Sequence, residues 1–168
     1  MEGIASGLLG GAVVAVFYFI IDLMRGRPLM TPSVLGEIFL LRTPLTATPD
    51  TAAVLLYTAF HFLVFIALGL FLAALIRAAE HGALARYALV QLLVVFEVFF
   101  YGVLSVASEE ARGMFPFLGV LAANTLAAIT MLAWQWRHHP RLRRAFHREP
   151  LGAADHHSVS PATTAGRT

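Results

Sequence analysis

The chain has 168 residues, of which 58% are hydrophobic and 13% are charged. Soluble domains average about 45–50% apolar and about 25% charged residues, so this composition excludes an ordinary soluble domain. The absence of cysteine excludes disulfide bonds, thiolate metal sites and a cysteine nucleophile. We therefore expect an all-α integral membrane protein.

Four apolar stretches are long enough to cross a bilayer, whose hydrocarbon core of about 30 Å needs about 20 helical residues. They predict spans at about 3–24, 51–77, 87–108 and 113–136, which together form a four-helix bundle within a transmembrane domain over residues 1–139. The first stretch has no basic segment before it and no small-residue cleavage site after it. It is therefore interpreted as a permanent helix and not as a signal peptide.

Small residues recur at every fourth position of the first span, at Gly3, Gly7, Gly11 and Ala15. On a helix this spacing places them nearly along one line, where another backbone can approach closely. Such lines are a main route to helix association in lipid. We expect a packing face here, either within the bundle or between two copies of the chain.

The first connection, residues 22–50, is the longest and is rich in proline. Its middle carries several apolar residues, and Thr31 followed by Pro32 is typical of a helix start. This helix is too short to span, so we expect it to lie flat at the outer membrane surface. A reentrant segment or a contact surface for a partner is the alternative. Asp22 and Arg25 are expected to form an interfacial ion pair.

Polar residues occur near the middle of the second, third and fourth spans, at His61, Glu97 and Asn124. Each lies roughly 16–18 Å from a charged residue that ends its span, at the rise of a helix. In an antiparallel bundle they would meet near the midplane. Thr58 and Tyr101 lie about one turn from His61 and Glu97 and extend the same polar faces.

Two interpretations of this polar cluster compete. In one, a protonated Glu97 bonds His61 or Asn124 and only fixes which helices pack together. In the other, the carboxyl and the imidazole carry a proton or hold a ligand, a metal or a cofactor, as ionisable residues inside membranes commonly do.

Several specific chemistries are excluded by their motifs. The sequence has no Glu-x-x-His pair for a di-iron site, no HExxH zinc motif and no glycine-rich phosphate loop. No second histidine lies inside a span, so a haem with one histidine ligand at His61 is the weak remaining haem alternative. No metal site is assigned, the cofactor stays unidentified, and an enzyme is not favoured.

The arginines predict the orientation. Seven lie close to helix ends on the side that holds the N-terminus, the 77–86 loop and the tail, whereas the four on the other side are accompanied by acidic residues. Because positively charged loops stay inside, we expect both termini to face the cytoplasm of a bacterial inner membrane. Trp134 and Trp136 fit the aromatic belt at that interface.

Residues 140–168 are polar and basic, and then rich in small residues. Such a segment cannot bury enough apolar surface to fold alone, so we expect a disordered cytoplasmic tail whose arginines touch anionic lipid headgroups. Weak binding of a transition metal is the alternative use of the five histidines near this end, which are His138, His139, His147, His156 and His157.

The leading functional hypothesis is a non-enzymatic structural or accessory subunit that packs against itself or a larger membrane complex through the glycine face and the outer loop. The alternative is a small transporter, or a protein that handles protons or a cofactor, centred on Glu97 and His61. The bilayer is the partner that the composition itself predicts, and no nucleic-acid partner is expected.

Overall fold

The computed structural model describes residues 1–79, 91, 98, 101–102 and 116–139. Within them the chain forms α1 (Glu2–Met24), α2 (Met30–Gly36), the π-helical turn η1 (Glu37–Leu41), α3 (Thr51–Ala79) and α6 (Phe117–His138). No strand occurs in this part of the chain. The predicted all-helical class is therefore confirmed.

Three of these helices, α1, α3 and α6, are long enough and apolar enough to cross a membrane. Even the shortest, α6 with 22 residues, reaches about 33 Å at about 1.5 Å per residue. The chain is thus suited to be a multi-pass membrane protein. Most of the span expected at 87–108, including Glu97, lies outside the described residues, so the four-helix bundle stays a prediction.

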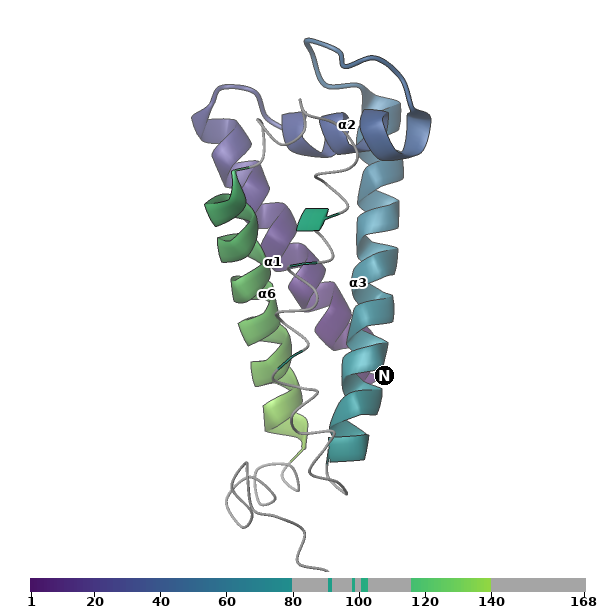
Figure 1. The fold of residues 1–168 in the computed structure, drawn as a ribbon, viewed down its shortest axis with the longest axis vertical. Coiled ribbons are helices and arrows are strands. Elements are labelled where there is room, and N and C mark those ends of the chain that lie inside the picture. The colour runs from purple at the N-terminus through teal and green to yellow at the C-terminus, as the bar shows by residue number, and fades with distance from the viewer. Residues whose placement is uncertain (80–90, 92–97, 99–100, 103–115, 140–168) are drawn as a thin grey trace, which may run out of the picture.

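The three long helices stand side by side with α1 as the link between the other two. Starting from the N-terminus, α1 runs obliquely across the molecule, and α3 and α6 both run in the opposite direction (Figure 1). α1 packs against α3 along one side and against α6 along another. The buried apolar side chains between them are Val14, Phe65, Leu72, Ile76, Ala123, Ala127 and Met131.

Glycines let the backbones of α1 and α3 touch. A Cβ added to Gly7 would lie 2.7 Å from the Cα of Ile66, and a Cβ added to Gly69 would lie 2.6 Å from the backbone nitrogen of Gly7. No real side chain tolerates such distances from backbone atoms. Helix contacts of this kind gain van der Waals packing that bulkier residues would prevent.

A second face of α1 is shaped for α6. A Cβ on Gly10 would lie 2.5 Å from the sulfur of Met131, and the Ser6 hydroxyl donates a hydrogen bond of 3.5 Å to the Met131 carbonyl. Both Ser6 and Gly10 are buried. Small residues on two faces of α1 therefore place it between its two neighbours.

The connection between α1 and α3 folds into a cap over one end of the helices. Figure 1 shows α2 lying across this end, at a steep angle to α1 and α3. Val34 and Leu35 of α2 are buried with Val120 of α6, and Gly36 packs against the backbone of Ala53 at the start of α3. The cap is thus part of the packed structure.

Candidate functional site

His61 connects α3 to α1. Its Nε2 lies 3.0 Å from the backbone carbonyl oxygen of Gly11. Because a carbonyl can only accept, Nε2 is the donor in this hydrogen bond. The half-buried imidazole lies among the rings of Tyr57, Phe62 and Phe65, whose centroids are 5.8, 5.5 and 4.7 Å away. This polar group therefore serves the contact between two helices.

The other members of the predicted polar cluster have different surroundings. Asn124 is buried in α6, with 6% of its surface exposed. Tyr101 is half-buried and meets Phe117 edge to face at 5.1 Å. Thr58 is exposed, and its hydroxyl donates to the carbonyl of Val54 in the preceding turn of its own helix. Within the described part of the chain, the hydrogen-bond partner of His61 comes from α1 and not from this cluster.

The four small residues that were predicted to form one packing face of α1 do not all have the same surroundings. Gly3, Gly7 and Gly11 face α3, where a Cβ on Gly11 would lie 3.1 Å from the ring of Phe62. Ala15 is exposed. Gly10, which the four-residue spacing does not include, is the glycine that faces α6. Only a close reading of the flanking positions in the glycine-rich run could have singled it out.

A buried carboxylate holds the start of the cap. The backbone N–H of Thr31 donates to Oδ2 of Asp22 at 2.6 Å, and the Thr31 hydroxyl donates to Oδ1 at 2.8 Å. Asp22 is 2% exposed, and it forms no ion pair with Arg25. The expected ion pair is replaced because two hydrogen bonds satisfy a buried carboxylate without burying a guanidinium.

The start of α2 also differs from the sequence-based expectation. The helix begins at Met30 after Leu29, whose backbone is left-handed with φ 67°, so Thr31 and Pro32 lie inside the first turn. The Thr31 side chain is turned to Asp22 and caps nothing in its own helix. The capping acceptor comes instead from the end of α1, nine residues earlier.

A second buried carboxylate, Glu37, holds the end of the cap. It accepts hydrogen bonds from the N–H of Thr46 at 2.9 Å, from the Thr46 hydroxyl and from the Ser33 hydroxyl at 3.2 Å. Burial would raise the pKa of Glu37, but these three hydrogen bonds together outweigh it and hold the pKa below its ordinary value. The carboxylate is therefore a stable acceptor at neutral pH.

Ser33 joins this cap to α3. Its buried Oγ accepts the N–H of Asp50 at 2.8 Å while its hydroxyl proton goes to Glu37. Asp50 in turn accepts the N–H of Ala52 at 2.9 Å and so caps the first turn of α3. The cap is thus fixed at both ends by hydrogen bonds that sequence reasoning missed, because turns of the backbone bring together partners that no helical or strand spacing predicts.

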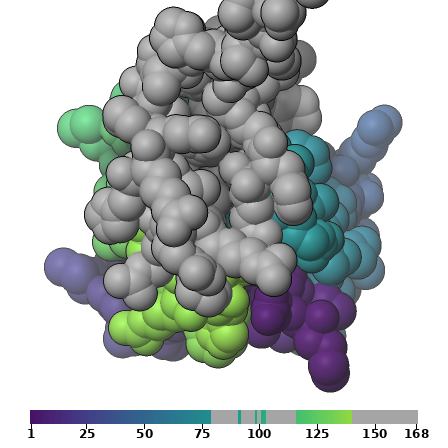
Figure 2. Space-filling model, turned by 90° about the horizontal axis from the view of Figure 1, so that it is seen from below, coloured from purple at the N-terminus to yellow at the C-terminus, as the bar shows by residue number. Residues whose placement is uncertain are grey.

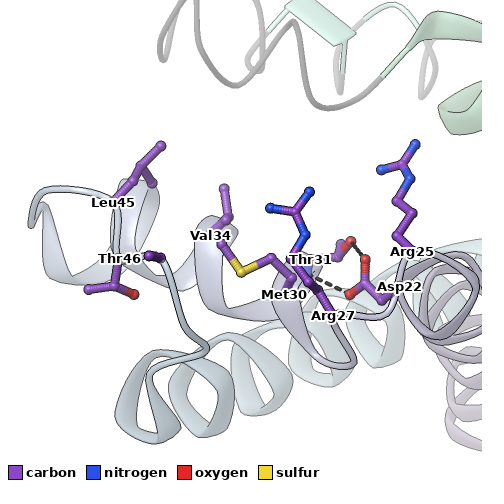
Figure 3. Close-up of a pocket in the computed structure, with 9 residues that line it drawn as sticks. Asp22, Arg25, Arg27, Met30, Thr31, Val34, Leu45 and Thr46 are labelled. Atoms are coloured by element: carbon purple, nitrogen blue, oxygen red, sulfur yellow. Dashed lines mark hydrogen bonds between the residues drawn. The ribbon is translucent and has the colours of Figure 1, made fainter.

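A pocket of about 220 Å³ opens beside this cap. Asp22, Arg25 and Arg27 line it together with the apolar side chains of Met30, Val34 and Leu45. In Figure 3 the guanidinium ends of Arg25 and Arg27 point to the same side as Val34 and Leu45, while Asp22 turns to Thr31. The pocket therefore combines two cations with an apolar wall.

At the opposite end of the molecule the two ends of the described chain meet. Nε2 of His139 lies 3.1 Å from Oε2 of Glu2, and Figure 2 shows the N-terminal residues beside the end of α6. Close by in α6, Gln135 is fully buried, and neither the oxygen nor the nitrogen of its side-chain amide has a hydrogen-bond partner among the described residues. This buried amide could not be predicted from the sequence, because glutamine beside tryptophans also fits an interfacial position.

The residues that the structure describes contain no group of three or more histidine or acidic side chains that could hold an ion. The tail histidines His147, His156 and His157 lie outside this part of the chain. The described arrangement can fix helices and present a basic pocket. No protein-family model matches the chain, and neither a curated protein nor a solved structure does.

Proposed function

We propose that this protein is a structural or accessory subunit of a membrane assembly and that it has no enzymatic activity of its own. The observation that supports this best is the hydrogen bond between His61 and the Gly11 carbonyl. The N–H group of the imidazole donates its hydrogen bond to the backbone of a neighbouring helix, and three aromatic rings surround the imidazole. An intramembrane polar residue placed in this way stabilises helix packing.

The carboxylates of the cap support the same proposal. Both oxygens of Asp22 and of Glu37 accept hydrogen bonds from neighbouring residues of the cap. Carboxylates saturated in this way are poor general bases, because a proton taken up would break bonds that already stabilise the charge. Their role is to keep the cap in one shape.

An accessory subunit also needs a surface for its neighbours, and α3 offers one. Large apolar side chains are exposed along its first half, at Leu55, Leu56, Phe60, Leu63 and Val64. In a membrane this surface faces either lipid tails or another transmembrane helix. We assign it, together with the rigid cap, to contact within a homo-oligomer or a larger complex.

We further propose a bacterial inner membrane with both termini in the cytoplasm. Glu2 and His139 lie within 3.1 Å of each other, which supports one common side for the N-terminus and the end of α6. The arginines of the tail favour the cytoplasm for that side. A reporter that is active only in the cytoplasm, fused after Thr168, is expected to be active. An inactive fusion, with the matching periplasmic reporter active, would reverse the orientation.

The main test of the proposed function measures mass. Extracted from its own membrane in mild detergent, the protein is expected to form a complex of fixed stoichiometry that is heavier than the 18.3 kDa chain. A monomer under these conditions would contradict the assembly role.

The role of His61 is tested with His61→Leu, which removes the donor to Gly11. We expect the free energy of unfolding to fall by about 0.6 kcal/mol, the average measured for hydrogen bonds between membrane helices, and by no more than about 1.7 kcal/mol, the largest such value. Thr58→Val is the matched control, because Thr58 is exposed and bonds only within its own helix. It is expected to leave stability unchanged.

The same variants distinguish a structural role from proton handling. Vesicles containing the wild-type protein are expected to show no proton flux above that of empty vesicles, and neither variant should change this. If the wild type conducts protons and His61→Leu abolishes the flux while the free energy of unfolding stays the same, the transporter hypothesis replaces ours.

A further inference from the structure

The pocket beside the cap has unpaired positive charge. Arg25 and Arg27 are exposed, and neither forms an ion pair or a side-chain hydrogen bond with any residue in the described part of the chain. Long charged side chains that line a pocket usually find a partner when a carboxylate is near. The carboxylate that lines the described part of this pocket, Asp22, already accepts hydrogen bonds from Thr31.

Asp22 does not cancel the pocket's positive charge. Both of its oxygens accept hydrogen bonds from Thr31, at 2.6 and 2.8 Å, and the residue is 2% exposed. Among the residues that the structure describes, Asp22 and the two arginines are the charged ones that line the pocket, so this described lining has a net positive charge. Buried and bonded, Asp22 fixes the backbone that carries the arginines and leaves their guanidinium groups for an anion.

One wall of the pocket is apolar. Met30, Val34 and Leu45 belong to the hydrophobic cluster that packs beneath the cap, and Val34 is 1% exposed. An inorganic anion gains nothing from such a wall. A molecule with an anionic group next to a hydrocarbon part would contact both the arginines and the wall.

The position of the pocket relative to the bilayer narrows the class of molecule that it can bind. α1 ends at Met24, and Arg25 and Arg27 follow directly after this apolar helix of 23 residues. A helix of that length spans about 34 Å, close to the hydrocarbon thickness of a bilayer. The arginines therefore lie at the level of the lipid headgroups, where guanidinium groups bind phosphate through paired hydrogen bonds.

We propose that this pocket binds the phosphate group of an anionic membrane lipid between Arg25 and Arg27, with the start of an acyl chain against the half-buried side chains of Met30 and Leu45. The shared chemistry is a phosphate ester, which a lipid headgroup or a small soluble phosphate could supply. The apolar wall and the height of the pocket favour the lipid. This site goes beyond the proposed accessory role, and its ligand contacts, Arg25, Arg27, Met30 and Leu45, are not residues on which that role is argued.

The test uses the full-length protein in detergent, titrated with short-chain phosphatidylglycerol and followed by thermal unfolding and native mass spectrometry. Arg25→Gln/Arg27→Gln is expected to weaken phosphatidylglycerol binding about thirtyfold, since each arginine near a lipid surface contributes about 1 kcal/mol. Arg27→Gln alone should weaken it about fivefold by the same estimate.

Arg42→Gln is the matched control. Arg42 is exposed in the same connection and does not line the pocket, so the variant removes one positive charge from the same region. Its affinity for phosphatidylglycerol should equal that of the wild type. Without lipid all variants should unfold at the wild-type temperature, because none of these three side chains forms a bond in the described structure.

Three outcomes would overturn the proposal. If Arg42→Gln weakens binding as much as Arg27→Gln, attraction to the surface charge in general replaces a site. If phosphatidylcholine binds as tightly as phosphatidylglycerol, the pocket does not select an anionic lipid. If glycerol phosphate, which has the phosphate ester but no acyl chain, binds as tightly as the lipid, the ligand is a soluble phosphate.

Discussion

The contact between α1 and α3 and the cap above it are held together in opposite ways. Between α1 and α3, the glycines Gly3, Gly7 and Gly69 have no side chain and so let the two backbones touch. In the cap, buried carboxylates at Asp22 and Glu37 accept hydrogen bonds from the loop. In lipid, helices already satisfy their own backbone, so close packing decides association. In a loop, the backbone N–H groups are not bonded within a helix and need other hydrogen-bond acceptors. The positions of these acceptors therefore determine the shape of the loop.

The largest effect is expected from breaking the helix contact with Gly7→Leu. The backbone of Phe65 and Ile66 occupies the space that the new side chain needs, so α1 and α3 must move apart. We expect the free energy of unfolding to fall by about 3 kcal/mol or more, at the upper end for overpacked sites. Denaturation in mixed micelles measures it.

Gly102→Ala is the control for this change. A Cβ at Gly102 meets nothing within 4 Å, and the residue is helical. Replacing glycine by alanine in a helix should therefore raise stability by about 0.5–1 kcal/mol. Equal destabilisation by both variants would show that the close approach of α1 and α3 is not what Gly7 provides.

The next effect comes from removing an acceptor of the cap with Asp22→Ala. The N–H and the hydroxyl of Thr31 then lose both of their acceptor atoms inside a buried site. We expect a loss of about 2–3 kcal/mol, the cost of buried donors without partners. Limited proteolysis within residues 25–50 measures the opening of the cap directly.

Thr31→Val separates the contributions in that region. It removes the hydroxyl bond but keeps the backbone bond to Asp22, so its cost should be about 1 kcal/mol. If Asp22→Ala costs no more than Thr31→Val, the backbone bond at 2.6 Å adds nothing and the comparison with the helix contact fails.

The smallest effect concerns pH and Glu37. Its pKa is lowered in the folded protein from an ordinary value of about 4.5, so the carboxylate stabilises the fold above that pH. This contribution is lost as the pH falls through the lower, folded value. The unfolding temperature of the wild type should therefore drop below pH about 4.5, and Glu37→Gln should reduce this drop.

Arg42→Gln serves as a control here too, because it changes a charge at the end of the same π-helical turn without removing a carboxyl group. It should leave the acid-induced drop as in the wild type. An unchanged drop in Glu37→Gln would assign acid sensitivity to other carboxylates.

The sequence predicted the membrane helices because their signal is local. Long apolar stretches identify α1, α3 and α6, and the all-helical class follows from them. The candidate site was harder to predict. The hydrogen bond of His61 ends on the carbonyl of Gly11, 50 residues away, and a backbone carbonyl has no residue-specific signature. A pairing with a polar side chain at the same depth was therefore the natural expectation.

The cap escaped prediction for a related reason. Asp22 reaches Thr31 because the chain turns back at Gly26, whose φ of +68° favours glycine, and at Leu29. Proximity in sequence pointed to Arg25 as the partner of Asp22. The turn brings a donor pair to the carboxylate instead, which a residue pattern without geometry does not reveal.

The three levels at which α1 and α3 are joined have a consequence for movement. The glycine contact lies toward one end, His61 bonds Gly11 farther along, and α2 bridges the other end from Asp22 to Ala53. We therefore expect α1 and α3 to move together as one rigid unit. α6 packs on α1 through apolar side chains and the polar contacts of Ser6 with Met131 and of Glu2 with His139, without a bridge like the cap, so relative movement of the helices should appear as a displacement of α6.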